Sequence, residues 1–355
     1  PKKKTPRVDN FLHTGGNIYS SMKKLCSVTF EEVVSVENLC EAWQEFIRGK
    51  RKKKDVQEFM IHLGDEIANL HAALMSGQYT HGEYKHFRIN DPKPRDIHKA
   101  TVRDRLLHHA IHRKLYPFFA KLFISDSFSC QNKKGLHRAL ERFESLARKA
   151  SRNNTRTCWI LKCDIRKFFA SVDHVILIAI LRERITNSRL LDLLERVIRS
   201  FETRHGKGIP LGNLTSQLFA NVYMNELDYF VKHELRMKHY ARYADDFVFL
   251  SHDRSELLGC LPKIASFLSG SLALDLHPNK VFIKTLASGV DFLGWVHFPH
   301  HRVLRTKTKQ RMYKRIGHNP NRQSIESYLG LLSHGDAHGI SKRLENLWWL
   351  LSLKY

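Results

Sequence analysis

The stretch Tyr243-Ala244-Asp245-Asp246 places two adjacent carboxylates between two apolar runs. Residues 239–243 and 247–250 on either side are rich in aromatic and β-branched side chains, which favour strands. A polar dipeptide between two such runs predicts a hairpin turn. Two neighbouring negative charges repel each other unless a cation lies between them, so the turn indicates a divalent-metal site. A solvated Asp-Asp turn is the alternative for this tetrapeptide taken alone.

A third carboxylate follows another apolar run, because Trp159–Asp164 has the pattern of a buried strand that ends in Asp164. If the two strand regions are neighbours in one sheet, Asp164, Asp245 and Asp246 converge at its edge. Such a site holds two divalent cations on the order of 4 Å apart, which activate a hydroxyl and stabilise the leaving oxygens in an in-line phosphoryl transfer. We expect two Mg²⁺ ions, with Mn²⁺ as the alternative, because Mg²⁺ prefers oxygen ligands. Asp164 and Asp245 are the expected main ligands, and Asp246 is a supporting one.

Length and charge restrict the partners of the chain. Its 355 residues predict two or three packed subdomains. Lys plus Arg number 59 against 35 Asp plus Glu, and a net charge of +24 indicates a polyanionic partner, with nucleic acid as the first candidate. The sequence shows no signal peptide and no apolar stretch long enough to span a bilayer, so no membrane partner is expected. The six cysteines are scattered without Cys-x-x-Cys spacing, which fits a reducing cytoplasm.

The remaining pattern alternates between helices and strands. Two amino-terminal helices within 36–75 are joined by the basic run Lys50–Lys54, and Val102–Phe119 predicts a helix that ends near Pro117. Further helices are expected over 175–201, 214–235 and 255–268, further strands over 280–284 and 289–298, and a basic helical region beyond 302.

Five segments in order resemble the sequence blocks of reverse transcriptases over nearly the whole chain. Lys162–His174 resembles the first palm block, and Tyr243–Asp246 the second metal block. Gly208–Gln217 resembles the loop and helix beneath the templating base pair. Leu276–Lys280 is similar to the block that carries a lysine near the triphosphate, and Phe292–Trp295 to the strand pair that grips the primer end. One such match is weak evidence, but five in the family's order make chance a poor explanation.

The resemblance implies a right-hand α+β polymerase. We expect a basic amino-terminal arm over 1–35, amino-terminal helices and fingers over 36–158, a palm with an antiparallel sheet over 159–300, and a helical thumb over 301–355. The implied activity is RNA-templated DNA synthesis from deoxynucleoside triphosphates on a template RNA with a cDNA or primer strand.

The resemblance also assigns roles to individual residues. Phe169 stands five residues after Asp164, where the family places an aromatic ring that excludes a 2′-hydroxyl, whereas Phe168 is expected in the core. Gly212 lets the backbone approach the base pair, and Lys280 neutralises charge or protonates the leaving pyrophosphate. The other implied residues are Ile165 for metal and substrate, the primer grip Phe292, Leu293, Gly294 and Trp295, and the substrate-binding residues Lys93, Arg95, Leu211, Gln217 and Tyr243.

Two departures from the common pattern narrow the family. Many reverse transcriptases carry Gln where this chain has Leu211 and Pro where it has Gln217. The sequence Leu211-Gly212-Asn213 with Ser216-Gln217 resembles the reverse transcriptases of diversity-generating retroelements. Those enzymes copy a template-repeat RNA with frequent errors at adenines, and a small basic pentameric accessory protein is their partner.

At Gln131 the family often has Arg, so Lys133 or Lys134 is expected to take over that triphosphate contact.

Three other interpretations remain open. A phage-defence reverse transcriptase would share the polymerase blocks and differ in its product. A retron or group II intron enzyme is disfavoured by Leu211 and Gln217. A non-catalytic RNA-binding scaffold belongs to a different class, and the intact Asp164, Asp245 and Asp246 argue against it.

Overall fold

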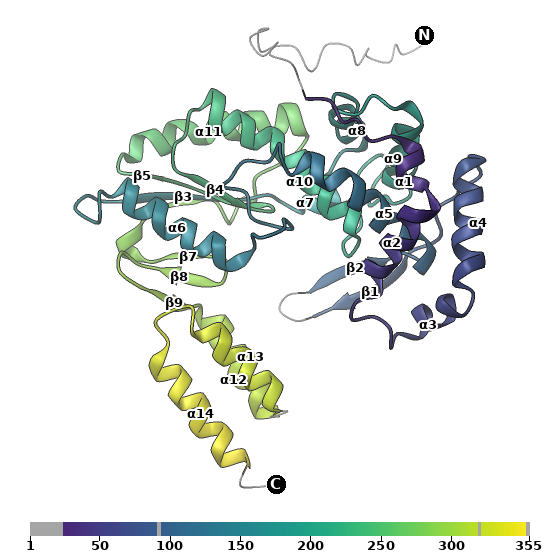
Figure 1. Ribbon diagram of the computed structural model, residues 1–355. Coiled ribbons are helices and arrows are strands. Elements are labelled where there is room, and N and C mark those ends of the chain that lie inside the picture. Colours follow the sequence, from purple (N-terminus) through teal and green to yellow (C-terminus); the bar gives the residue numbers. More distant parts are fainter. Residues whose placement is uncertain (1–23, 91–93, 319–320, 353–355) are drawn as a thin grey trace. The chain divides into compact units, whose positions relative to one another are not determined.

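The computed structural model describes residues 24–90, 94–318 and 321–352 (Figure 1). The chain forms two compact units that are not consecutive in sequence. The first comprises residues up to 125, 165–234 and 263–276, and the second comprises residues 126–164, 235–262 and 277 onward. Most of the predicted basic arm, residues 1–23, lies outside the described residues.

The first unit is mainly helical. Its central helix α5, Val102–Phe119, buries Leu106, Ala110 and Ile111 between α2 and α10. The helix includes Pro117 in its last turn and begins where the Thr101 hydroxyl accepts a hydrogen bond from the Asp104 amide at 3.2 Å. The other helices are α1 (Phe30–Val34), α2 (Val36–Phe46), α3 (Lys54–Ile61), α4 (Leu63–Met75), α7 (Phe168–Ser171), α8 (His174–Arg182), α9 (Ser188–Arg199) and α10 (Leu214–Tyr229), which continues as a π-helix over Phe230–Glu234.

A two-stranded antiparallel hairpin, β1 (Lys85–Ile89) and β2 (Arg95–Lys99), completes the first unit. Every side chain of β1 is exposed, so this ribbon gains little from burial on its own. The main chain of His98 attaches β2 to the rest of the unit, because its amide donates to the Leu211 carbonyl and its carbonyl accepts from the Asn213 side chain.

The second unit contains a four-stranded antiparallel sheet in the order β4-β5-β3-β6. Its strands are β3 (Trp159–Asp164), β4 (Tyr240–Tyr243), β5 (Asp246–Ser251) and β6 (Phe282–Thr285). Because β3 and β5 lie in the interior of the sheet, their middle residues are buried on both faces. The prediction that the strands of Asp164 and of Asp246 are neighbours is confirmed.

One face of this sheet packs on helix α6, Leu136–Ala150, and on a three-stranded sheet of β7 (Val290–Phe292), β8 (Trp295–His297) and β9 (Arg302–Leu304) (Figure 1). Phe143 and Leu146 of α6 share an apolar core with Ile160, Val248 and Phe292. Side chains alternate between the two faces of a strand, so every second residue of β3 and β5 lies on this face. Asp164 and Asp246 belong to this set.

The carboxyl-terminal helices pack on the same small sheet. They are α12 (Thr306–His318), α13 (Arg322–Leu332) and α14 (His338–Ser352), and their buried Met312, Ile325 and Leu344 share a core with Trp295. A Cβ at Gly335 would overlap the Trp295 ring, so this close approach requires glycine. Helix α11, Arg254–Leu272, contributes residues to both units.

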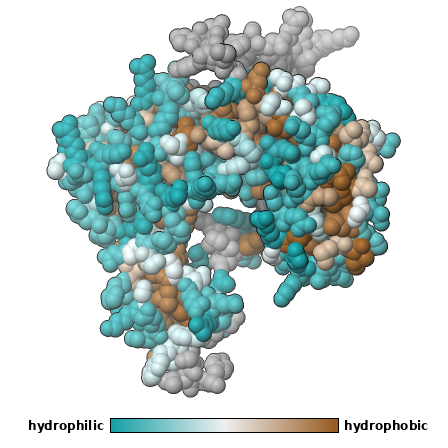
Figure 2. Space-filling view, viewed as in Figure 1, coloured by the Kyte–Doolittle hydropathy of each residue, from teal (hydrophilic) through white to brown (hydrophobic). Residues whose placement is uncertain are grey.

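The surface of the first unit carries an apolar area. Figure 2 shows brown surface over the amino-terminal helices, where exposed apolar side chains include Val36, Met60, Ile61 and Met75. No helix in the described ranges has both the length and the apolar character needed to cross a membrane. The six cysteines are free thiols.

Candidate active site

The carboxylates meet at one end of the four-stranded sheet. Asp164, the last residue of β3, lies directly opposite Asp246, the first residue of β5. Because directly paired residues of antiparallel strands project on the same face, their side chains share one side of the sheet. Tyr243 pairs with Asp246, so the turn of the hairpin consists of Ala244 and Asp245 alone. Ala244 has φ of 56°, a left-handed conformation that this short turn imposes at its first residue.

Two lysines from different strands or loops pair with these carboxylates. Lys280 Nζ lies 2.8 Å from Asp164 Oδ1, and Lys162 Nζ lies 3.2 Å from Asp246 Oδ2. Asp246 Oδ1 is buried without a hydrogen-bond partner among the described residues. Burial raises the pKa of Asp246 to about 6; Lys162 lowers this pKa, whereas the nearby Asp164 and Asp245 raise it. Three carboxylates therefore interact within one small volume. Of these, Asp164 is paired with Lys280 and Asp246 is paired with Lys162.

The fit of these residues to metal ions is partial. Within the ranges that the structure describes, no three His, Cys, Asp or Glu side chains have the arrangement of a metal-binding group. Lys280 and Lys162 pair with one oxygen each of Asp164 and Asp246, and the metal-binding role of the three carboxylates stays a prediction. The donors are nevertheless carboxylate oxygens, which suit Mg²⁺, and a buried carboxylate oxygen without a partner is satisfied by a cation.

The loop before α10 lies against the hairpin β1–β2 in the first unit. The His98 amide donates to the Leu211 carbonyl at 3.1 Å, and Asn213 Nδ2 donates to the His98 carbonyl at 3.0 Å. Gly212 has φ of +108°, and a Cβ there would come within 3.0 Å of Ile97 Cγ2. This residue is therefore glycine both for its conformation and for the close approach of β2.

The other nucleotide-binding predictions for the first unit are placed as follows. Arg95 begins β2 and is exposed, whereas Lys93 lies outside the described residues. Leu211 and Gln217 are half-buried, Ile165 is buried, and Phe169 is half-buried in α7. Phe168 is 2% exposed, which confirms its predicted core position, and its ring contacts that of Phe169 edge to face.

The segment with the predicted triphosphate lysines belongs to the second unit. Gln131 turns inward, where its Nε2 donates to the Ser127 carbonyl at 3.0 Å. Lys134 Nζ also donates to that carbonyl, at 2.7 Å, and is half-buried over the Phe128 ring. Lys133 is exposed, and its contact with a triphosphate stays a prediction. Tyr243 is half-buried, and burial raises the pKa of its hydroxyl.

The predicted primer grip is a tight hairpin. Leu293 and Gly294 have φ of 52° and 90°, so they form a two-residue turn between β7 and β8. Phe292 and Trp295, the pair that closes this turn, are 0% and 1% exposed. Their side chains therefore build the core, whereas Leu293 and Gly294 of the turn are half-buried, and a grip on the primer end stays a prediction.

Comparison with known proteins identifies the family. Residues 89–297 match the family model described as "Reverse transcriptase (RNA-dependent DNA polymerase)". The chain belongs to the reverse transcriptases. Its fold is the right-hand polymerase fold, and its reaction is RNA-directed DNA synthesis.

Individual relatives of this reverse transcriptase are distant. "Protein YkfC" of Escherichia coli is 24% identical over 70% of this chain and 73% of its own length. "Group II intron-encoded protein LtrA" of Lactococcus lactis is 25% identical over 49% of this chain, and this chain covers only 29% of LtrA. Among solved structures, apo telomerase from Candida Tropicalis, truncated from its C-terminal domain, aligns with a TM-score of 0.47 at 12% identity, over 66% of this chain and 58% of its own.

One residue of the site was not predicted from the sequence. Lys162, two residues before Asp164, contacts Asp246 from within β3. Its signal in the sequence is a charged residue inside an apolar strand, on the same face as the carboxylate two positions later.

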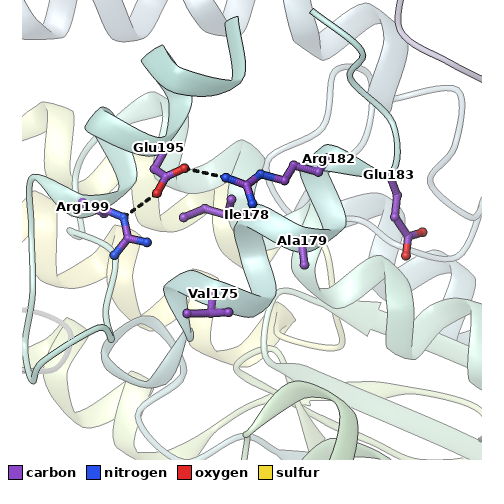
Figure 3. A pocket seen from close by; sticks show the side chains of 7 residues that line it. All are labelled: Val175, Ile178, Ala179, Arg182, Glu183, Glu195 and Arg199. Atoms are coloured by element: carbon purple, nitrogen blue, oxygen red, sulfur yellow. Dashed lines mark hydrogen bonds and ion pairs between the residues drawn. The ribbon is translucent and has the colours of Figure 1, made fainter. Parts of the chain in front are cut away.

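A cavity of about 410 Å³ between α8 and α9 shares no residue with the carboxylate site (Figure 3). Glu195 accepts hydrogen bonds from Arg182 at 3.0 Å and from Arg199 at 2.8 Å. These charges satisfy one another beside the apolar Val175 and Ile178, so the cavity offers no catalytic group to the reverse transcriptase.

Proposed function

We propose that this reverse transcriptase makes error-prone, adenine-mutagenised cDNA from the template-repeat RNA of a diversity-generating retroelement. The observation that carries the proposal is the segment Leu211–Gln217, which has Leu and Gln where many reverse transcriptases have Gln and Pro. Leucine cannot form a hydrogen bond around the incoming nucleotide, whereas glutamine can. A pocket with one fewer directional contact discriminates less between correct and incorrect bases.

The surroundings of Leu211 support this interpretation. Its carbonyl is occupied by the His98 amide, and Gly212 leaves no side chain between the loop and β2. The main chain of the loop is therefore held in place, and the loss of a polar group at position 211 is not compensated by its backbone. The nearby Asn213 amide is also committed, since it donates to the His98 carbonyl.

We assign the chemistry to residues of this chain as follows. The primer 3′-hydroxyl attacks the α-phosphate of a deoxynucleotide, and Asp164 and Asp245 are the residues that would hold the divalent cations. Bound cations would favour the ionised hydroxyl and neutralise charge on the leaving pyrophosphate. Lys280 lies 2.8 Å from Asp164 and would neutralise charge on the leaving pyrophosphate or protonate it. Phe169 is the gate against a 2′-hydroxyl.

Nucleic-acid partners follow from charge. Helix α12 carries Lys307, Lys309, Arg311, Lys314 and Arg315, and the net charge is +24. Such a surface binds phosphate backbones without reading sequence. We include a small basic pentameric accessory protein as a partner on the strength of the family resemblance.

A primer-extension assay on a defined RNA template tests the proposal. The products are sequenced, and misincorporation opposite adenine is compared with misincorporation opposite the other three template bases. A marked excess at adenine supports the mutagenic subclass. Robust extension with accurate copying of adenine would refute the subclass and leave the polymerase intact.

The similarity to LtrA, a group II intron-encoded protein, supports a second candidate, namely an intron-type enzyme with accurate synthesis. The same assay separates the two, because the second candidate predicts equal error at all four template bases. Splicing assistance to a group II intron RNA would be a positive result for the second candidate alone.

A further inference from the structure

Lys162 is a charged residue in the interior of the four-stranded sheet. It lies in β3 with β5 on one side and β6 on the other, paired with Val248 and Phe282. The whole residue is 8% exposed. Burying an ammonium group costs free energy unless charge and hydrogen bonds compensate it, so a lysine in this position needs defined partners.

Lys162 has two oxygen partners among the described residues. Its Nζ lies 3.2 Å from Asp246 Oδ2 and donates to the main-chain carbonyl of Asp291 at 2.9 Å. Asp246 opens β5, whereas Asp291 is the middle residue of β7. A single ammonium group therefore joins a carboxylate of the active site to the strand that leads into the Leu293–Gly294 turn.

The contacts continue from Asp291 to the carboxyl-terminal helices. The Asp291 carboxylate pairs with the Arg305 guanidinium. The Arg305 amide donates to the Gly294 carbonyl at 3.2 Å, and the Arg305 carbonyl accepts from the Lys309 amide at 3.0 Å in the first turn of α12. Arg305 thus fixes both the hairpin turn and the start of α12, and all of these residues belong to one compact unit.

We propose that Lys162 is a positioning residue for DNA synthesis, which holds the Asp246 carboxylate to β7 and, through Asp291 and Arg305, to the start of α12. Its ammonium group also removes one negative charge from the carboxylate cluster, so the protein gives up some metal affinity for a fixed arrangement of Asp246. The inference rests on the polymerase chemistry of the carboxylates and is independent of the adenine-error proposal.

The test compares Lys162→Met, which keeps the length of the side chain and removes its charge, with Lys284→Met. Lys284 is an exposed lysine of β6 with no contact to the carboxylates among the described interactions, so it controls for loss of one charge on the same sheet. Two quantities are measured on the full chain: steady-state kcat and KM for a deoxynucleotide on an RNA template with a DNA primer, and Mn²⁺ binding to the nucleic-acid-free protein by electron paramagnetic resonance.

For Lys162→Met we expect a loss of kcat of about tenfold or more, because a misplaced catalytic group is costly, with a smaller change in KM. Mn²⁺ should bind roughly three- to tenfold more tightly, because a positive charge next to Asp246 is gone. Lys284→Met should leave kcat and Mn²⁺ binding unchanged. A kcat within twofold of the wild type, or a lower kcat with unchanged or weaker Mn²⁺ binding, would overturn the proposal, since a purely structural role predicts no tighter metal binding.

Arg305→Met provides a second approach if Lys162→Met fails to fold. The proposal expects it to lower kcat with Mn²⁺ affinity unchanged, because Arg305 acts on Asp246 only through Asp291 and Lys162. In the double variant the two losses should not add, since both interrupt one chain of contacts. Simple additivity, or no effect of Arg305→Met on kcat, would refute the connection to α12. Failure of the carboxylate chemistry itself would instead appear as DNA synthesis that survives Asp245→Asn.

Discussion

Replacing Asp246 by Asn should stabilise the metal-free protein at pH 8. The side chain of Asp246 is 21% exposed, and its pKa is about 6 in place of the ordinary 3.8, with burial as the largest cause. A pKa difference of about 2 units corresponds to about 3 kcal/mol. Ionisation of Asp246 in the folded chain therefore lowers the free energy of unfolding by about this amount. Asn has the shape of the protonated acid, and its amide oxygen can take the place of Asp246 Oδ2 and accept from Lys162, so this cost is removed without a new cavity.

The pH dependence follows from the direction of the shift. Because the pKa is higher in the folded chain, the native state binds more protons than the unfolded state between pH 3.8 and about 6. The unfolding free energy of the wild type therefore falls as the pH rises through this window and levels off above it. The advantage of Asp246→Asn should be near zero at pH 4 and reach up to about 3 kcal/mol at pH 8, or a melting temperature higher by roughly 5 °C.

Urea unfolding of both proteins in EDTA, from pH 4 to pH 8, measures this difference. Added Mg²⁺ should stabilise the wild type more than the variant, because the cation binds the ionised carboxylates of the folded state. The difference between the two proteins isolates Asp246 from every other titrating group. Two results would refute the inference that the buried, ionised Asp246 carboxylate destabilises the folded state. One is a variant that is no more stable than the wild type at pH 8, and the other is a stability difference that does not change between pH 4 and pH 8.

Four further substitutions test the site. Asp245→Asn should reduce primer extension by at least about 100-fold with an unchanged melting temperature, which excludes unfolding as the cause. Phe169→Ala should raise ribonucleotide incorporation by about tenfold or more relative to deoxynucleotide incorporation, measured as the ratio of kcat/KM values, because it opens space for the 2′-hydroxyl. Leu211→Gln should lower the error frequency at template adenines in sequenced cDNA, and unchanged error would contradict the role given to that position. Asn213→Ala removes the 3.0 Å bond to the His98 carbonyl and should lower the unfolding free energy by about 1 kcal/mol in urea titrations, whereas no change would mean that the bond is replaced by water.

The sheet that carries the carboxylates could be predicted from the sequence for a physical reason. Both β3 and β5 are short runs of apolar and β-branched or aromatic residues. A carboxylate lies at the last position of β3 and at the first position of β5. Burial of such runs in one sheet leaves few other pairings that avoid burying Asp164 or Asp246 completely. The pairing of Asp164 with Asp246 confirms that inference.

Other features depend on contacts that a sequence pattern does not encode. The attachment of β2 to the loop at Leu211 uses main-chain groups, which are the same for every residue type. The sequence predicted strands on either side of Leu293 and Gly294. The alternation of apolar and polar residues did not show that Phe292 and Trp295 face the core. The prediction of a three-carboxylate metal cradle missed Lys162, because a lone lysine within a strand is compatible with an exposed edge as well as with an ion pair in the sheet interior.

The contact of Trp295 with Gly335 has a consequence for engineering this enzyme. Trp295 closes the hairpin turn and is also part of the surface on which α12, α13 and α14 are assembled. A chimera that exchanged only the carboxyl-terminal helices with those of a relative would place a foreign backbone on this indole, and any residue larger than glycine at the matching position would collide with it. A viable graft would therefore have its junction before β7, so that the hairpin and the helices are inherited together.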